Sequence, residues 1–234
     1  MGDKPVCAVM GVGPGNGAAF ARRFAKEGYA VGLMARNEQY LTELASEIEG
    51  AKPFPCDATD PGAIASAFAR VSTELGDVDV LLYNAGSGTF GTFDDVDADA
   101  LERAWKINTR GLFQSAKAVV PAMRAKGTGQ IVITGATASL RGGARFAAFA
   151  QAKAAQRSLA QSMAKHLGPD GIHVSLVIVD GMIDLPRMRT MMPDAPPERF
   201  LQPDAIADAV WHLTRQHPSA WTFELDVRPN VEAW

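Results

Sequence analysis

Four closely spaced glycines form the first stretch of this sequence that is suited to binding a ligand. Gly11, Gly13, Gly15 and Gly17 lie in "MGVGPGNGAAFARRFAKEG", between an apolar run at 6–10 and an alanine-rich stretch. Glycine lets a backbone turn tightly and approach a pyrophosphate, and the N–H groups at a helix start carry partial positive charge. The spacing fits Gly-x-x-x-Gly-x-Gly at 11, 15 and 17, and also Gly-x-Gly-x-x-Ala at 13, 15 and 18. Both patterns predict a dinucleotide site, with a ligand-free glycine turn as the alternative.

A basic residue follows the second apolar run, where the type of dinucleotide would be selected. The sequence there is "GLMARN", with Ala35 and Arg36 and no acidic residue. A carboxylate at this place would hold the ribose hydroxyls of NAD, whereas a basic group accommodates the extra phosphate of NADP. One charged hydrogen bond contributes about 1.5–3 kcal/mol, which corresponds to a preference of roughly tenfold to a hundredfold. We therefore expect NADP (NADPH) as the cofactor, with a solvated surface arginine as the alternative interpretation of Arg36.

Strand-like and helix-like stretches alternate along the whole chain and must position these residues. The strand candidates are 6–10, 29–34, 52–56, 78–83, 130–134, 173–179 and 221–227. Continuously apolar strands that alternate with helices predict a parallel sheet with helices on both faces. Right-handed crossovers make this an α/β, Rossmann-type doubly wound sheet of about seven strands, which binds ligands at the carboxyl ends of its strands. We predict a single dinucleotide-binding domain over residues 1–234.

Composition excludes several classes of partner. The formal net charge is -3 and Lys and Arg are scattered along the chain, so we expect no nucleic-acid partner. No apolar run reaches the roughly 18 residues of a membrane span, and "MGDKPVCAVM" does not resemble a signal peptide, so we expect a cytoplasmic protein without a membrane partner. Cys7 and Cys56 fall in strand-like stretches, which favours reduced thiols in the core. The sequence has no metal-ligand spacing, so we expect no metal.

In one long segment, 180–203, the apolar residues do not recur at the spacing of a helix or a strand. It reads "DGMIDLPRMRTMMPDAPPERFLQP" and is rich in Pro, Met and Arg. Loops of this length within one domain are usually functional, so we predict that it forms a substrate loop for a small molecule.

The order of motifs resembles the short-chain dehydrogenase/reductase family over essentially the whole chain. The matching motifs are the glycine loop, "PCDATD", "LLYNAG", "KINTRG" and Lys153 of the family's Tyr-x-x-x-Lys. The resemblance implies cofactor-binding roles for Gly11, Gly15, Gly17, Arg36, Asp57, Asn84, Ala85, Gly86, Lys153 and Ile183. It implies catalytic roles for Asn108 and Lys153. Two simpler interpretations stay open, namely that Asp57 caps the helix beginning near Pro61 and that Asn84 is a turn residue.

The sequence departs from the family pattern where the chemistry takes place. Phe149 in "FAAFAQAK" stands at the tyrosine position, and Ala136 in "ITGATASL" stands at the serine position. Asp180-Gly181 replaces Pro-Gly, and Leu185 replaces a threonine. The family's tyrosine hydroxyl donates a proton to the alkoxide formed by hydride transfer, and a phenyl ring cannot do so. General acid catalysis contributes about 10²–10⁴-fold, or about 3–5.5 kcal/mol of barrier.

Several neighbouring groups are candidates for a substitute proton donor. They are Lys153 acting through water, the hydroxyls of Thr134, Thr137 and Ser139 after the fifth strand, and Asp180 and Asp184 after the sixth.

Two functions follow from these observations. The first is an NADP-dependent oxidoreductase that acts on a small carbonyl or alcohol with an atypical proton donor. The alternative is an NADP-binding non-catalytic protein, a pseudoenzyme with a regulatory or scaffold role, because fold alone does not establish chemistry. The helices expected at 109–125 and 146–167 are rich in small apolar residues, which favours a helix-packed interface. The family resemblance then implies a homodimer or homotetramer.

Overall fold

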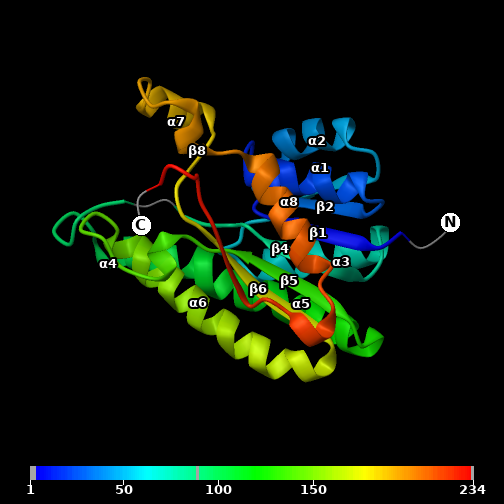
Figure 1. The fold of residues 1–234 in the computed structure, drawn as a ribbon. Helices are drawn as coiled ribbons and strands as arrows, with labels where there is room; N and C mark the ends of the chain where they lie inside the picture. The colour runs from blue at the N-terminus through cyan, green and yellow to red at the C-terminus, as the bar shows by residue number, and fades with distance from the viewer. Residues whose placement is uncertain (1–3, 88–89, 233–234) are drawn as a thin grey trace.

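The computed structural model describes all residues except 1–3, 88–89 and 233–234. Among the described residues, seven parallel strands form one sheet in the order β3-β2-β1-β4-β5-β6-β9 (Figure 1). In chain order these strands are β1 (Val6–Met10), β2 (Ala30–Ala35), β3 (Ala51–Pro55), β4 (Val78–Tyr83), β5 (Gly129–Thr134), β6 (Ile172–Val179) and β9 (Glu224–Val227). The predicted Rossmann-type sheet is confirmed, and its order reverses between β1 and β4, where such sheets bind ligands.

Helices cover both faces of the sheet. Figure 1 shows α1 (Asn16–Lys26), α2 (Glu38–Glu47) and α8 (Pro203–Thr214) on one side, opposite α5 (Gly111–Lys126) and α6 (Ala147–Leu167). The helix α3 (Pro61–Glu74) packs beside α5 on this second side. Side chains of a strand point alternately to the two faces, so Cys7 and Val9 enter one apolar cluster while Ala8 and Met10 enter the other. Burial on both faces explains why the strands are apolar throughout.

A helix of unusual geometry precedes α5. The helix α4 (Ala98–Trp105) passes into a π-helical turn at Lys106–Arg110, which continues directly into α5. The hydroxyl of Tyr83 in β4 donates to the carbonyl oxygen of Ile107 in this turn. Gly111 leaves room for that hydroxyl, because a Cβ atom at this position would lie 2.3 Å from Tyr83 Oη. Single π-helical turns occur often at functional sites.

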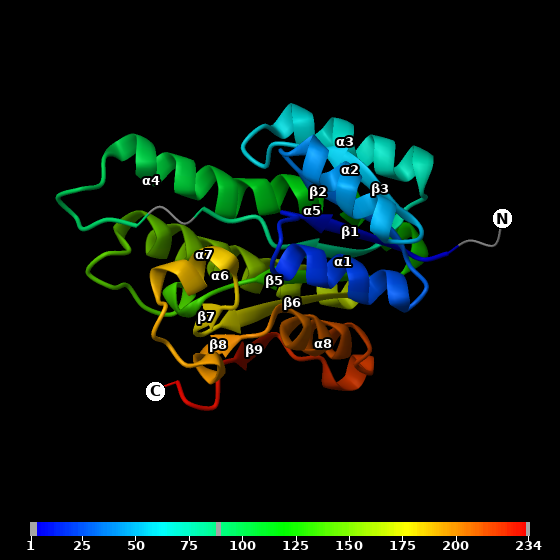
Figure 2. The ribbon, with the colours of Figure 1, turned by 90° about the horizontal axis from the view of Figure 1, so that it is seen from above.

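The segment 180–203 leaves the sheet after β6 and contains short elements that the sequence did not indicate. These are β7 (Met182–Ile183), α7 (Pro186–Met191) and β8 (Phe200–Leu201), and β7 pairs with β8 in a separate small sheet. The Asp184 carboxylate accepts from both Arg189 Nε at 2.7 Å and Arg189 Nη2 at 3.0 Å, which ties β7 to α7. Figure 2 shows α7, β7 and β8 toward the same end of the molecule as α4.

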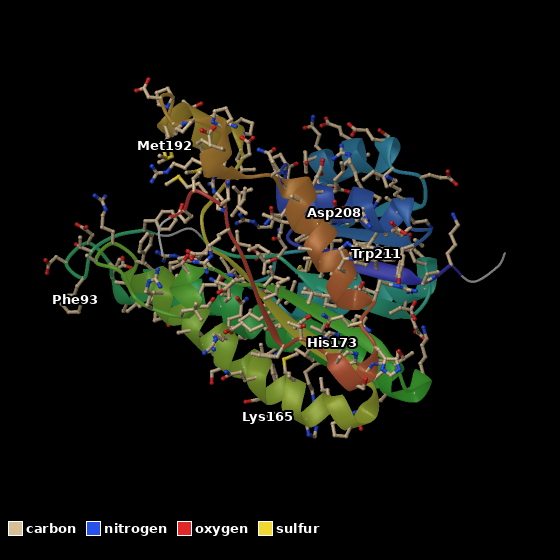
Figure 3. All side chains as sticks on the ribbon, viewed as in Figure 1. Phe93, Lys165, His173, Met192, Asp208 and Trp211 are labelled. Carbon is tan, nitrogen blue, oxygen red and sulfur yellow. The ribbon has the colours of Figure 1, made fainter. Side chains whose placement is uncertain are left out.

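Side chains at this end of the molecule include large apolar groups that face outward. Figure 3 places Phe93 at the far edge of the loop before α4 and Met192 on the projecting segment after β7. Phe93 is 88% exposed and Met191, in α7, is 72% exposed. No helix in the described part of the chain combines the length and apolar character needed to cross a bilayer.

Candidate cofactor and active site

The glycine loop and the loop after β4 are locked together at the switch point of the sheet. Gly11 has a φ angle of 96°, and a Cβ atom there would lie 2.3 Å from the backbone nitrogen of Ala85. Asn84 Nδ2 donates to the carbonyl oxygen of Gly11 at 2.8 Å. A Cβ atom at Gly17 would lie 2.7 Å from that same oxygen. The backbone therefore approaches itself too closely here for any residue other than glycine at 11 or 17.

The start of α1 bears no acidic group. Its N-cap residue Gly15 makes no side-chain capping bond, and no Asp or Glu stands in the first turn. A Cβ atom at Gly13 would meet no atom of the described chain within 4 Å. Asn16 is buried, and its Oδ1 has no hydrogen-bond partner among the described residues. Free N–H groups and the partial positive charge of a helix start favour an anion such as pyrophosphate.

Arg36 and Asp57 follow neighbouring strands at the same edge of the sheet. Arg36 comes directly after β2 and is exposed. Asp57 comes after β3, and its Oδ1 accepts from the backbone nitrogen and the hydroxyl of Thr59, both at 2.8 Å. The cap of α3 is Asp60, whose Oδ1 accepts from Gly62 N at 2.7 Å, so Asp57 does not cap this helix.

Asn108 lies in the π-helical turn and is completely buried. Its side-chain Nδ2 donates to the backbone carbonyl oxygen of Ala104 at 2.8 Å. The backbone carbonyl oxygen of Asn108 accepts from Gln156 Nε2 at 2.7 Å. Asn108 Oδ1 has no partner in the part of the chain that the structure describes. A Cβ atom at Gly86 would lie 3.2 Å from this oxygen, so the unpaired acceptor sits beside the predicted cofactor motif.

Lys153 projects from α6 to the same place. Its side chain is buried, and its Nζ donates to the carbonyl oxygen of Thr134 at 2.7 Å and to Gln156 Oε1 at 3.0 Å. A Cβ atom at Gly86 would lie 3.8 Å from this Nζ. Burial disfavours the charged ammonium and lowers the pKa of Lys153 to about 7.

Apolar groups stand at the two positions where the family carries hydroxyls, and the Phe149 ring lies beside the ammonium. The Phe149 ring centroid lies 5.9 Å from Lys153 Nζ, within cation–π range. Phe90 makes edge contacts with both Phe149 and Phe146, at centroid distances of 5.8 Å and 5.4 Å. Ala136 offers only a methyl group, while its backbone nitrogen donates to Ser139 Oγ at 3.1 Å. The three phenyl rings form an aromatic wall for a ligand at this edge.

Three of the other candidate donors, Thr137, Asp180 and Asp184, have hydrogen-bond partners of their own. Thr137 donates its hydroxyl proton to the Asp180 carboxylate, which also pairs with Arg228 Nη1 at 3.2 Å. Hydrogen bonds from Arg189 and Gln202 hold the pKa of Asp184 below its usual value, so this carboxyl group is ionised at neutral pH. The Asp184 carboxylate therefore has no proton to give at neutral pH, and the Thr137 hydroxyl donates to Asp180.

The predicted substrate loop crosses the glycine loop. The Leu185 side chain lies over Gly15, where a Cβ atom would meet its Cδ2 at 2.5 Å. Ile183, two residues earlier, pairs with Leu201 in the small sheet and is half-buried. The segment thus passes directly over the place where the glycines would hold a pyrophosphate. Within the described residues, no three His, Cys, Asp or Glu side chains gather at a metal-binding distance.

Comparison with known proteins identifies the family. The sequence model of the short chain dehydrogenase family matches residues 5–195 of this chain. The chain belongs to the short-chain dehydrogenase family. A solved short-chain dehydrogenase from Rhodopseudomonas palustris is similar with a TM-score of 0.83 and 34% identity, over 96% of this chain and 98% of that one.

Two further proteins are similar to this chain over nearly its whole length. An uncharacterized oxidoreductase of Staphylococcus epidermidis is 27% identical over 227 residues, which cover 97% of each chain. The alcohol dehydrogenase of the archaeon Thermococcus sibiricus, solved with 5-hydroxy-NADP, has a TM-score of 0.87 and 25% identity over 98% of both chains.

The structure brings together most of the site residues expected of this short-chain dehydrogenase, and adds others. One connected group contains seven of them: Gly11, Gly17, Asn84, Ala85, Gly86, Asn108 and Lys153. Arg36 and Asp57 lie apart from this group, after β2 and β3. Sequence reasoning missed Gln156, which joins Lys153 to Asn108, and Phe90, which joins Phe149 to Phe146. Gln156 stands three residues after Lys153 on one helix, and this spacing was the available signal.

Proposed function

We propose that this protein is an NADP-dependent oxidoreductase that reduces a small carbonyl compound, or oxidises the corresponding alcohol, with an atypical proton donor. The observation that carries the proposal is the buried ammonium of Lys153 beside Gly86, in the loop that Asn84 ties to the glycine cradle. A buried cation is costly unless it serves a ligand or a partner. The residues fit the cofactor, since a Cβ atom at Gly13 would meet nothing within 4 Å in the described chain and no acidic side chain stands in the first turn of α1.

Each part of the site then has a task. The nicotinamide cofactor, when bound, supplies the hydride chemistry. The glycine loop and the start of α1 bind the pyrophosphate, and Arg36 binds the additional phosphate of NADP. Asp57 holds the adenine and Lys153 the ribose, as the family resemblance implies. The aromatic wall of Phe90, Phe146 and Phe149 excludes water from one side of the substrate.

We expect Arg36→Ala to weaken NADPH binding by roughly tenfold to a hundredfold and to leave NADH binding nearly unchanged, because one charged hydrogen bond to phosphate is lost. Fluorescence titration of the purified protein with each nucleotide measures this. Arg70→Ala is the matched control, since Arg70 is an exposed arginine on α3 that pairs with Glu74. Equal affinity of the parent for NADPH and NADH would contradict the role of Arg36.

A second candidate function is a nucleotide-binding protein without turnover. It is favoured by the methyl group of Ala136 and the phenyl ring of Phe149 at the two positions where the family carries hydroxyls. NADPH binding without NADPH oxidation on any carbonyl substrate would select this second function. If the protein binds neither NADPH nor NADH, both candidate functions are contradicted.

The same proposal includes a homodimer or homotetramer. The side chains of Leu101, Trp105 and Phe113, on α4 and α5, are exposed although they are large and apolar, and covering such groups stabilises assemblies. We expect light scattering to give a mass that is two or four times the 24.9 kDa of one chain. A mass of one chain at micromolar concentration would contradict this assembly.

A further inference from the structure

Lys153 is a buried cation with uncharged neighbours. The residue is 4% exposed, and the acceptors of its Nζ are a backbone carbonyl and a side-chain amide. Buried lysines are normally paired with a carboxylate. Over the described residues, no carboxylate forms an ion pair with this Nζ. The protein thus keeps a lysine at the centre of the site under conditions that disfavour its charge.

The geometry leaves one N–H of this ammonium for a ligand. An ammonium group has three N–H donors, and Thr134 and Gln156 accept two of them. The Nζ atom lies beside Gly86 and over the Phe149 ring. A hydroxyl carried by this ring would lie near the ammonium, so a water molecule or the substrate oxygen can take that place and share the third N–H with the ribose that Lys153 holds in the proposed function.

Gln156 fixes the ammonium without neutralising it. The side chain is completely buried, and its Nε2 donates to the carbonyl oxygen of Asn108, which turns its Oε1 toward Lys153. An amide oxygen accepts a hydrogen bond but brings no negative charge. A carboxylate in the same position would stabilise the protonated lysine and make it a weaker acid.

The charged groups of the surrounding elements have other partners. Glu102 of α4 pairs with Lys106 of the π-helical turn, and Arg110 of that turn donates to the Thr59 carbonyl oxygen. Asp180, after β6, pairs with Arg228 and accepts from the Thr137 hydroxyl. Arg157 of α6 pairs with Glu224 of β9. Burial alone therefore lowers the pKa of Lys153 to about 7. A group with a pKa near the working pH is an effective general acid.

We propose that Lys153 is the proton donor of this site, directly or through one water, and that Gln156 is the positioning residue that keeps it acidic. This inference rests on the proposed function. When bound, the reduced nicotinamide dinucleotide would supply a hydride to the carbonyl carbon, so that a C–H bond forms and the π electron pair moves to oxygen. That oxygen takes a proton from Lys153, the ammonium becomes an amine, and solvent returns a proton to it. The nicotinamide is oxidised and the carbonyl is reduced to an alcohol.

The direction of the reaction sets the sign of the pH dependence. Reduction needs the ammonium, so its rate falls as pH rises through about 7. Oxidation of the alcohol needs the neutral amine, so its rate rises through the same pH.

Two substitutions at Gln156 should move this midpoint in opposite directions. Gln156→Glu places a carboxylate next to the ammonium and should raise the midpoint by about one to three pH units. Gln156→Met keeps the bulk, removes an acceptor of the charged form, and should lower the midpoint. The midpoint is measured twice, by the pH profile of carbonyl reduction and by NMR titration of ¹³C-labelled lysine Cε in the cofactor-free protein. Lys153→Arg, which keeps the charge without titrating, should remove the break and lower reduction by about 10²-fold or more.

Opposite shifts in both measurements support the proposal. A lysine midpoint near 10 in the parent, or a midpoint that does not respond to Gln156→Glu and Gln156→Met, overturns it. Reduction by Lys153→Arg at the parental rate overturns the donor role alone. Absence of carbonyl reduction in the parent, despite NADPH binding, overturns the proposed function and the donor role with it.

Discussion

Phe149→Tyr combined with Ala136→Ser should raise NADPH-dependent carbonyl reduction by roughly tenfold to a hundredfold. A positioned general acid contributes about 10²–10⁴-fold, and the Lys153 ammonium already supplies part of this through a longer path. The Phe149 ring lies over Lys153 Nζ at 5.9 Å, so a hydroxyl on this ring gains a cation that stabilises its phenolate form. Turnover with a panel of aldehydes and ketones measures the effect in the parent, both single variants and the double variant.

The control for this experiment adds a hydroxyl elsewhere on the same kind of ring. Phe93→Tyr is suitable, because Phe93 is 88% exposed in the loop before α4. It should leave both turnover and NADPH affinity unchanged. A parent that reduces carbonyls and gains nothing from the double change would show that the donor already present is sufficient. Turnover in the double variant alone would indicate that the parent is the non-catalytic protein of the alternative proposal.

The sheet could be predicted from the sequence because its signal is local. Each strand is an apolar run between turn residues, and the predicted β1 and β4 agree with the structure at both ends. The strands predicted at 29–34, 52–56, 130–134 and 173–179 differ from the structure by one residue at one or both ends, and the strand expected at 221–227 differs most, since β9 begins only at Glu224. Trp221 stacks on His173 at 4.7 Å, and the Thr222 backbone nitrogen donates to Gln216 Oε1 at 2.8 Å. These contacts depend on distant residues, so the apolar pattern alone does not exclude 221–223 from the strand.

In the site, too, the residues placed by neighbouring sequence could be predicted, whereas the contacts between distant segments could not. Residues that follow strands directly, such as Asn84 and Asp57, are placed by the strand order, and their position at the sheet edge follows from topology. The partners of Lys153 do not follow from topology. The Gln156 amide reaches the Asn108 carbonyl only because a π-helical turn presents it, and Tyr83 helps to hold that turn. Such contacts between separate elements depend on packing, which has no signature in spacing.

Gly11→Ala should cost the most stability of any single change in the glycine loop. A positive φ angle costs an alanine about 1–2 kcal/mol, and overpacking against fixed atoms costs about 1–3 kcal/mol more. At Gly11 both apply, because φ is 96° and a Cβ atom would lie 2.3 Å from Ala85 N and 2.7 Å from the Asn84 carbonyl carbon. We expect the free energy of unfolding to fall by about 2–5 kcal/mol, measured by urea denaturation.

Two other glycines separate these contributions. Gly28 has a φ angle of 90° and nothing within 4 Å of its Cβ position among the described atoms, so Gly28→Ala should cost only the conformational part. Gly13 has neither a positive φ angle nor a close neighbour in the described chain, so Gly13→Ala should leave the cofactor-free protein nearly as stable as the parent. Because Asn84 bonds to Gly11, a shift of this loop should also weaken NADPH binding in any Gly11→Ala protein that folds. If Gly11→Ala and Gly28→Ala lower the free energy of unfolding equally, the close contact of Gly11 with Asn84 and Ala85 contributes nothing to the cost of the substitution. The packing of the glycine loop against the loop after β4 would then not contribute to stability.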